Sequence, residues 1–301
     1  MPRLSAIVPA TDRPATLARC VAAIGAAADP PEEVVVVDEA AARGPAAARN
    51  EGAARATGDL LVFVDADVVP HRDAFQRIRA TFERDPGLTA VFGSYDDAPA
   101  DPGVVSGFRN LLHHHVHHAG AGPAETFWAG LGAVRRDAFL AAGGFDADRY
   151  RFPAIEDVEL GDRLAAGGAR IELDPAVRGT HLKAWTLAGM VRTDFVARGI
   201  PWVELLLAGG RHSTALNLGW RHRASAAAAL ACLLGIAGRR PRRAAAAAIA
   251  LVALNRGFYA LLLRERGPAQ ALAGVGLHVV HHATAVAAVP VGVARHITRP
   301  R

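Results

Sequence analysis

The sequence predicts an α/β protein with a mixed, mainly parallel sheet flanked by helices, followed by a C-terminal helical membrane region. Three observations support this prediction. Short apolar runs alternate with helical stretches through residues 1–100. Acidic residues directly follow two of these runs, and residues 220–301 are apolar and punctuated by arginine. Strand–helix alternation at this spacing is typical of a parallel sheet with crossover helices.

The expected strands are runs of β-branched and other apolar residues. Residues 60–64 are five consecutive apolar residues, and residues 33–38 contain four valines. We expect strands at 4–9, 33–38, 60–64, 89–94 and 126–134. We expect helices at 13–27, 46–56, 73–82, 104–118, 136–142 and 155–166. Residues 187–207 carry spaced apolar and aromatic residues, which fits an amphipathic helix at a membrane surface.

Two carboxylates, Asp65 and Asp67, emerge at the end of the run 60–64. Side chains at i and i+2 of an extended segment lie on the same face, so the pair can bind one hard divalent cation. The carboxyl ends of strands in an open α/β sheet border its ligand crevice. The pattern therefore indicates a metal–diphosphate site, with an aspartate-rich turn as the alternative.

Charge is distributed unevenly along the chain. Residues 1–219 carry 22 Lys and Arg against 28 Asp and Glu, whereas residues 220–301 carry 12 Arg and one acid, Glu265. The arginines bracket long alanine- and leucine-rich runs, a pattern that favours a membrane segment over a nucleic-acid arm. Two cysteines, Cys20 and Cys232, have no metal-ligand spacing and indicate a reducing compartment.

The tail contains three apolar runs at about 224–238, 244–263 and 269–294. A membrane span needs about 20 residues, so the first run is short and the other two are long enough. We expect residues 1–210 to form one domain and residues 211–301 to form membrane-associated helices. A buried soluble helical domain is the alternative. The N-terminus runs into a strand without a signal peptide, so we expect the first domain on the cytoplasmic side of the cytoplasmic membrane.

Several further segments fit one arrangement. They are Pro9 to Arg13, Asp38-Glu39, Arg49 to Gly52, Asp65 to Asp67, Trp128 to Gly130, Gly143 to Asp146, Ile155 to Leu160, and His181 to Trp185. In this order and spacing the chain strongly resembles the family 2 glycosyltransferases of the GT-A fold, over roughly residues 4–205.

The resemblance implies a nucleoside-diphosphate sugar donor. Asp38 matches the acid that holds the nucleotide base, and Glu39 stands where the family usually has a second aspartate. Pro9, Asp12 and Arg13 match the loop that borders the nucleotide, and the resemblance also places Asn50 at this donor site.

The resemblance identifies Asp65 and Asp67 as the family's DxD motif, in which the second acid typically coordinates Mg²⁺ or Mn²⁺ on the diphosphate. A hard cation there neutralises the charge that develops on the departing nucleoside diphosphate.

Asp157 matches the catalytic base of inverting members, with Glu156 as a supporting or acceptor-positioning neighbour. Inverting transfer needs one carboxylate to take the proton of the acceptor hydroxyl. The alternative for both acids is stabilisation of the N-terminus of the following helix.

Trp128 and Gly130 match a segment that borders the acceptor and the donor sugar, although Trp128 can equally be a core residue. His181 to Trp185 weakly resembles the Gln-x-x-Arg-Trp element of processive members, but Ala184 replaces the arginine. We therefore expect single sugar transfer. His181 is a candidate third metal ligand, with a structural role as the alternative.

The five histidines at 113–115, 117 and 118 invite a metal interpretation. No Glu or Cys follows at a ligating spacing, so we favour a solvated or interfacial helix near the acceptor entrance.

We therefore expect a membrane-anchored, metal-dependent inverting glycosyltransferase that uses a UDP-sugar rather than a GDP-sugar and has no nucleic-acid partner. Its acceptor is expected to be lipid-linked or otherwise amphipathic, as in the cell envelope. Two alternatives remain, a nucleotidyltransferase and a catalytically silent membrane scaffold. The residues 6–13 lack the glycine-rich phosphate loop of a nucleotidyltransferase. A dinucleotide-binding oxidoreductase is disfavoured because G-x-G-x-x-G does not follow the first strand.

Overall fold

The computed structural model describes residues 1–38, 44–209 and 219–298. The chain forms two compact units. The first contains Met1–Ala100 and His117–Lys183, and the second contains Asp101–Val116 and Ala184–Arg301. The second unit thus begins before the expected boundary at residue 211, because residues 187–207 pack against the last helix of the chain.

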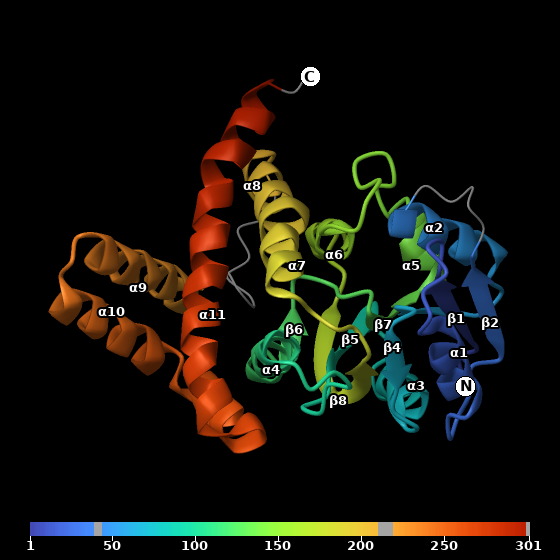
Figure 1. Cartoon of the computed structure of the whole chain (residues 1–301). Helices are drawn as coiled ribbons and strands as arrows, with labels where there is room; N and C mark the ends of the chain where they lie inside the picture. Colours follow the sequence, from blue (N-terminus) through green and yellow to red (C-terminus); the bar gives the residue numbers. More distant parts are fainter. Residues whose placement is uncertain (39–43, 210–218, 299–301) are drawn as a thin grey trace. The chain divides into compact units, whose positions relative to one another are not determined.

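The first unit is built on one eight-stranded sheet with the order β2-β1-β3-β7-β5-β8-β4, in which β6 pairs with β8 (Figure 1). Its strands are β1 Leu4–Pro9, β2 Glu33–Val37, β3 Leu60–Val64, β4 Val68–Pro70, β5 Ala90–Tyr95, β6 Gly122–Ala124, β7 Leu131–Arg135 and β8 Ile171–His181. Strands β1, β2, β3, β5 and β8 run in one direction, whereas β4, β6 and β7 run in the other. The predicted mixed, mainly parallel sheet is confirmed.

Helices cover both faces of this sheet. They are α1 Leu17–Gly25, α2 Gly44–Arg55, α3 Ala74–Arg84, α5 Arg136–Ala141 and α6 Glu156–Ala166. On one face, Cys20 and Ile24 of α1 and Phe75 of α3 pack with the strands in a continuous core. On the other face, the Phe63 ring of β3 lies 5.4 Å from that of Phe139 in α5. Both faces of β3 are therefore buried, which explains its uninterrupted apolar sequence.

Two strand predictions need correction. Residues 126–130 are not part of a strand: β7 begins at Leu131, where antiparallel pairing with β3 starts. The eleven-residue β8 was not predicted, because Asp174, Pro175 and Gly179 interrupt its apolar pattern. Its ladder with β5 is correspondingly irregular, with a register shift between Phe92 and Ser94.

The second unit is helical. Its elements are most of α4 Val104–Ala119, then α7 Leu187–Arg192, the π-helical turn η1 Thr193–Gly199, α8 Ile200–Leu207, α9 Trp220–Ala237, α10 Pro241–Leu254 and α11 Arg256–Thr298. Helices α7, η1 and α8 follow one another without a break, at the place where one amphipathic helix is predicted.

The apolar run 244–263 does not form one helix. It breaks at Asn255, whose backbone leaves helical geometry between α10 and α11. The Asn255 amide donates hydrogen bonds to Ser225 Oγ at 2.8 Å and to the Leu251 carbonyl at 2.9 Å. Helix α11 is itself kinked, with Gly267 at φ 77° directly before Pro268. Within the described residues, α11 is the one helix long and apolar enough to cross a membrane.

Candidate active site

The carboxyl ends of β1, β2 and β3 lie side by side because these strands are parallel neighbours. Pro9 pairs with Val37, and Ala10 N–H donates to the Val37 carbonyl at 2.8 Å, so Asp38 directly follows this edge. Arg13 curls back over the same edge: its Nε donates to the Asp38 carbonyl at 3.3 Å and lies 3.7 Å from the Asp38 carboxylate. Asp12 is exposed in the same loop. Glu39 lies outside the described residues.

The two acids of the DxD motif have different partners. Asp65 and Asp67 lie in the tight turn between β3 and β4. Asp65 Oδ1 accepts a hydrogen bond from Arg49 Nη2 at 2.7 Å. Asp67 Oδ2 lies 3.5 Å from His181 Nε2 at the end of β8. The charge of the Asp65 carboxylate is thus balanced by the Arg49 guanidinium, whereas the Asp67 carboxylate faces an imidazole.

The role of Arg49 was not predicted from the sequence. Its side chain on α2 is buried, and its Nη1 donates to Glu156 Oε1 at 2.8 Å while Nη2 binds Asp65. The guanidinium also lies 5.5 Å from the centre of the Phe145 ring. Arg49 therefore connects the turn after β3 to the N-terminus of α6. The sequence signal was available, since Arg49 begins a segment matched to the family.

Glu156 is a structural acid. It is 4% exposed, and its second carboxylate oxygen accepts a hydrogen bond from the Ala154 N–H at 2.9 Å. Both oxygens are thus occupied, one by Arg49 and one by the backbone. This geometry supports the expected supporting role of Glu156.

Asp157 is held by backbone donors at the start of α6. Its Oδ2 accepts a hydrogen bond from Ala129 N–H at 3.1 Å, and its Oδ1 accepts one from Val158 N–H at 2.8 Å. Burial and the adjacent Glu156 carboxylate raise the pKa of Asp157 to about 6. Asp157 therefore has the features of both interpretations: it lies in the first turn of a helix, and it is an acid with a pKa suited to proton transfer near neutrality.

The backbone of the segment Trp128 to Gly130 is hydrogen-bonded to both Asp65 and Asp157. While Ala129 N–H binds Asp157, the Gly130 carbonyl accepts a hydrogen bond from Asp65 N–H at 3.1 Å. The Trp128 indole lies over Gly130 so closely that a Cβ atom there would be 2.3 Å from the ring. Only glycine fits at position 130. The Trp128 ring is half-buried and packs edge-on against Tyr95, with ring centroids 4.9 Å apart.

His181 is fixed by stacking. Its ring lies parallel to that of Tyr95, with centroids 4.2 Å apart and an interplanar angle of 10°. Burial opposes ionisation of Asp67, but the hydrogen bond and charge of His181, with Lys183, lower the pKa of the Asp67 carboxyl below its usual range. A carboxylate and an imidazole facing each other fit a divalent ion such as Mn²⁺. The residues present are therefore suited to the expected metal.

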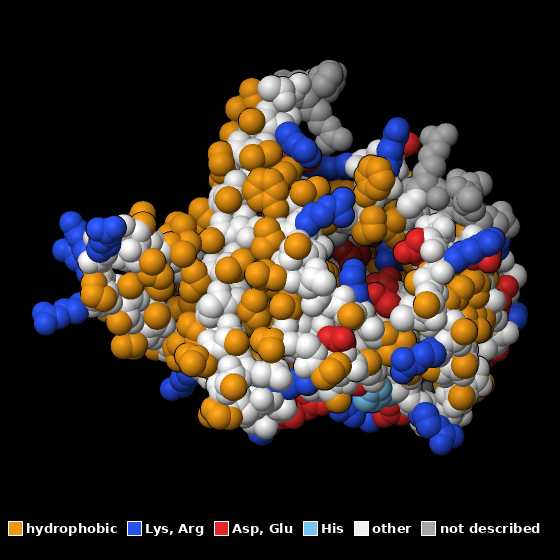
Figure 2. Space-filling view, in the orientation of Figure 1, with side chains coloured by type: hydrophobic (Ala, Val, Ile, Leu, Met, Phe, Trp, Pro, Cys, Tyr) orange, Lys and Arg blue, Asp and Glu red, His pale blue; other side chains and the backbone are white. Residues whose placement is uncertain are grey.

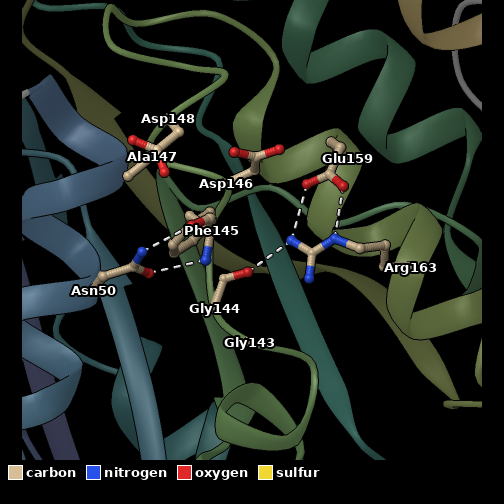
Figure 3. A pocket seen from close by; sticks show the side chains of 9 residues that line it. All are labelled: Asn50, Gly143, Gly144, Phe145, Asp146, Ala147, Asp148, Glu159 and Arg163. Carbon is tan, nitrogen blue, oxygen red and sulfur yellow. Dashed lines mark hydrogen bonds and ion pairs between the residues drawn. The ribbon is translucent and has the colours of Figure 1, made fainter. Parts of the chain in front are cut away.

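Asn50 has a different environment from the one expected of a ligand-binding side chain. Its amide donates to the Phe145 carbonyl and accepts from the Phe145 N–H, both at 2.8 Å. Figure 3 shows this pairing in the wall of a pocket of about 470 Å³. On the other side of the pocket, Arg163 pairs with Glu159 and donates to the Gly144 carbonyl at 2.6 Å. Asn50 thus holds the loop that follows α5.

The expectation of a solvated or interfacial histidine helix does not hold for two of the five histidines, whereas His113 and His115 are half-buried and His118 is exposed. His114 and His117 are 8% and 5% exposed. His117 Nδ1 donates to the Gly93 carbonyl at 2.8 Å, and its ring packs on Trp128 with centroids 5.4 Å apart. His117 is thus held by the backbone of β5 and by an aromatic neighbour in the same unit.

Comparison with known proteins agrees with this site. Residues 39–140 match the model of the family "Glycosyl transferase family 2". A segment of 161 residues is 29% identical to the "Pre-mycofactocin glycosyltransferase" of two Mycobacterium tuberculosis strains. This match covers 50% of the present chain and 32% of the relative, so the chain spans about a third of the curated relatives' length.

Among solved structures, the fold is similar to a mannosyltransferase from Pyrobaculum calidifontis in complex with GDP-Man and Mn²⁺. The TM-score is 0.57 at 21% identity, over 99% of this chain and 87% of that one. The fold is thus similar to that of a solved mannosyltransferase, and about a third of the chain matches the family model. Both findings agree with the resemblance noted in the sequence.

Proposed function

We propose that this chain transfers one sugar from a nucleoside-diphosphate sugar to an acceptor hydroxyl, with inversion and with a divalent metal. One observation carries the proposal. Buried Arg49 binds both Asp65 and Glu156, so the metal-binding turn and the residue next to Asp157 are parts of one rigid assembly. An inverting site needs this combination, because the base and the leaving group must act on the same anomeric carbon.

Asp157 is the proposed base. As the acceptor oxygen bonds to the anomeric carbon, its proton passes to Asp157, and the bond from that carbon to the phosphate oxygen breaks. The electron pair of the broken bond leaves with the nucleoside diphosphate. With a pKa of about 6, Asp157 is ionised at neutral pH and still basic enough to accept the proton.

Asp67 and His181 are the proposed metal ligands, with Asp65 as a further candidate. A bound Mg²⁺ or Mn²⁺ would neutralise negative charge on the diphosphate. Tyr95 fixes the His181 ring from one face, so its Nε2 is held toward Asp67. The Asp65 carboxylate orients the guanidinium of Arg49.

The donor site is proposed at the carboxyl edge of β1 and β2. Asp38, with Pro9, Asp12 and Arg13, is positioned to border the nucleotide, and Arg13 adds a positive charge beside it. A UDP-sugar remains our favoured donor. GDP-sugars are the alternative to test, since the archaeal neighbour was solved with GDP-Man.

The acceptor is proposed to be lipid-linked or amphipathic, as in a cell-envelope precursor, with Trp128 and Gly130 beside it. This part of the proposal depends on the second unit, whose helices expose many large apolar side chains (Figure 2). They include Trp220, Leu234, Ile236, Ile249, Leu263, Leu272 and Ile297. Such a surface is unusual for a soluble protein and suits attachment to a membrane, with the catalytic unit proposed on the cytoplasmic side.

The test is a panel of UDP-, GDP- and TDP-sugars incubated with the purified full chain, with and without Mn²⁺. We expect metal-dependent release of one nucleoside diphosphate, which Asp67→Ala abolishes. Asp137→Asn, at an exposed acid on α5, is the matched control and should retain the activity. Binding of no donor at millimolar concentration would refute the proposed donor chemistry.

A further inference from the structure

Four histidines of the second unit converge, and none of them is assigned to sugar transfer. His278, His281 and His282 lie on α11 at spacings of three and four residues, which places them on neighbouring positions of one helix face. His222 comes from the first turn of α9. The sequence shows the three α11 histidines only as interruptions of an apolar run, and the proposed transfer reaction uses none of the four.

Three of these side chains form a ligand-like group. The ring centroids of His222 and His282 are 4.7 Å apart, those of His281 and His282 are 5.3 Å apart, and those of His222 and His281 are 6.1 Å apart. One ring nitrogen of each lies within 4.8 Å of the corresponding nitrogens of the other two. A single ion with bonds of about 2.0–2.1 Å to imidazole nitrogen can bridge such distances with small side-chain adjustments.

His282 is the strongest indication that a ligand is required. Its side chain is 0% exposed, and neither ring nitrogen has a hydrogen-bond partner within the described part of the chain. A neutral imidazole always carries one donor and one acceptor, and buried polar groups of this kind are normally paired. Packing alone leaves both nitrogens of His282 without a partner, whereas a metal bond would satisfy one of them.

His281 has the supporting contact that is typical of a metal ligand. Its Nδ1 donates to Asp194 Oδ2 at 2.7 Å, and this leaves Nε2 available to an ion. Asp194 is 3% exposed and is itself held by Arg109 Nη1 at 2.9 Å. A carboxylate behind a histidine fixes the ring orientation and raises the basicity of the ligand nitrogen.

His278 helps to position the group. Its ring stacks on His282 at 4.6 Å between centroids, and its Nδ1 is hydrogen-bonded to the Tyr259 hydroxyl at 2.9 Å. Tyr259 and His278 thus fix one face of the His282 ring, as Asp194 fixes the His281 ring.

We propose that His222, His281 and His282 bind one transition-metal ion of the Zn²⁺ class. Three imidazoles suit Zn²⁺, Co²⁺, Ni²⁺ or Cu²⁺, whereas Mg²⁺ prefers oxygen ligands. A fourth position remains for water or another ligand. The ion would join α9 to α11, so its main effect is to stabilise the helical unit.

The test uses the full chain purified in detergent, with any affinity tag removed. We expect one zinc ion per chain by elemental analysis, and visible absorption of a four-coordinate ion after exchange with Co²⁺. A strong chelator should lower the melting temperature. His282→Ala and His222→Asn should lose the bound metal, while His296→Ala, on the same helix, should keep it. Asp194→Asn should weaken the affinity about 10- to 100-fold.

The His222→Asn variant is included because loss of metal from His282→Ala could result from misfolding. His222 is half-buried at a helix end, so its replacement should disturb folding less than replacement of the fully buried His282. Helix content by circular dichroism is measured for every variant. Folded wild-type protein that takes up neither Zn²⁺ nor Co²⁺ at micromolar concentration would overturn the proposal. Wild-type affinity in folded His222→Asn would overturn it as well. Neither result bears on sugar transfer, which is assayed separately with Mn²⁺.

Discussion

Asp157 differs from Asp65 and Asp67 in that both of its carboxylate oxygens accept hydrogen bonds from backbone N–H groups. Asp65 binds Arg49 and Asp67 faces His181. We expect Asp157→Asn to lower kcat by about 10²- to 10⁴-fold, because the amide cannot accept the acceptor proton. Donor affinity should stay within about twofold, since Asp157 does not bind the nucleotide. The comparison is made by steady-state kinetics and donor titration, and an unchanged kcat would exclude Asp157 as base.

The pKa of Asp157 predicts a pH profile. Because burial and Glu156 raise it to about 6, the base is protonated and inactive below that pH and ionised above it. We expect kcat/KM to rise about tenfold per pH unit below 6 and to level off above pH 7. The profile is measured at saturating Mn²⁺, so that metal binding does not limit the rate. An inflection near pH 4, the usual range for aspartate, would contradict the assigned environment.

Because Arg49 binds both Asp65 and Glu156, we expect these three residues to be energetically coupled. Replacing Arg49 by methionine leaves the carboxylates of Asp65 and Glu156 without their cation, and removal of one partner of a buried pair costs about 3–5 kcal/mol. We expect Arg49→Met to lower the melting temperature strongly. The double variant Arg49→Met/Glu156→Gln should be less destabilised than the sum of its single changes, because one of the stranded charges is gone. Additive losses would show that the pair is not coupled.

Some residues of the candidate site could be proposed from the sequence, whereas the roles of others could not. Asp65, Asp67 and Asp157 could be found because acids next to strand ends or helix starts have a local pattern. The role of Arg49 depends on partners 16 and 107 residues away, which no local pattern encodes. Tyr95 was missed for the same reason, since its stacking on His181 joins β5 to β8.

At the scale of elements, buried strands were predicted best. The bounds of β1 and β3 agree with prediction to the residue, since both are mainly apolar runs that are buried along nearly their whole length. Strands β4 and β6 are three residues each, too short to leave a periodic signal. Strand β8 carries Pro175 and Gly179, so its existence depends on pairing with β5 and not on its own propensity.

The turn before β7 gives a prediction at this scale. Gly130→Ala places a methyl group within 2.3 Å of the Trp128 ring, and the ring has to move. Overpacking of this kind costs about 1–3 kcal/mol, so we expect a lower melting temperature and reduced transfer. Gly25→Ala is the control, because a Cβ atom there meets nothing within 4 Å. If Gly130→Ala and Gly25→Ala had the same melting temperature and transfer activity, the close contact between Trp128 and Gly130 would not matter for stability or transfer.

The whole molecule combines an α/β unit, to which sugar transfer is assigned in our proposal, with a helical unit whose surface is strongly apolar. Composition predicted an apolar C-terminal part, because nearly all the acids precede residue 220, but it gave no sign that Asp101–Val116 belongs to the helical unit. It did not reveal how the apolar runs are divided into helices. Asn255 ends α10 through side-chain hydrogen bonds, and Gly267 kinks α11 through a positive φ. Both features depend on conformation at a single residue within a long apolar sequence.

Helix α11 therefore provides the test of membrane attachment. Little of its most apolar segment is buried within the protein, and both Val289 and Ile297 are exposed, at 45% and 74%. In a membrane, arginine near the centre of a span costs about 2.5–3.5 kcal/mol, whereas arginine near its end reaches the headgroups. We expect the wild-type chain to resist extraction from membranes by alkaline carbonate. Val289→Arg should release a large fraction of it, and Ile297→Arg should release little.

The contrast between these two variants separates membrane insertion from packing in water. On a soluble helical unit, both arginines would lie on an exposed surface and have similarly small effects, because long charged side chains are tolerated there. The wild-type chain would then leave the membrane fraction without detergent. That result would remove the basis for a lipid-linked acceptor while leaving the proposed sugar transfer intact, since every residue assigned to transfer lies in the first unit.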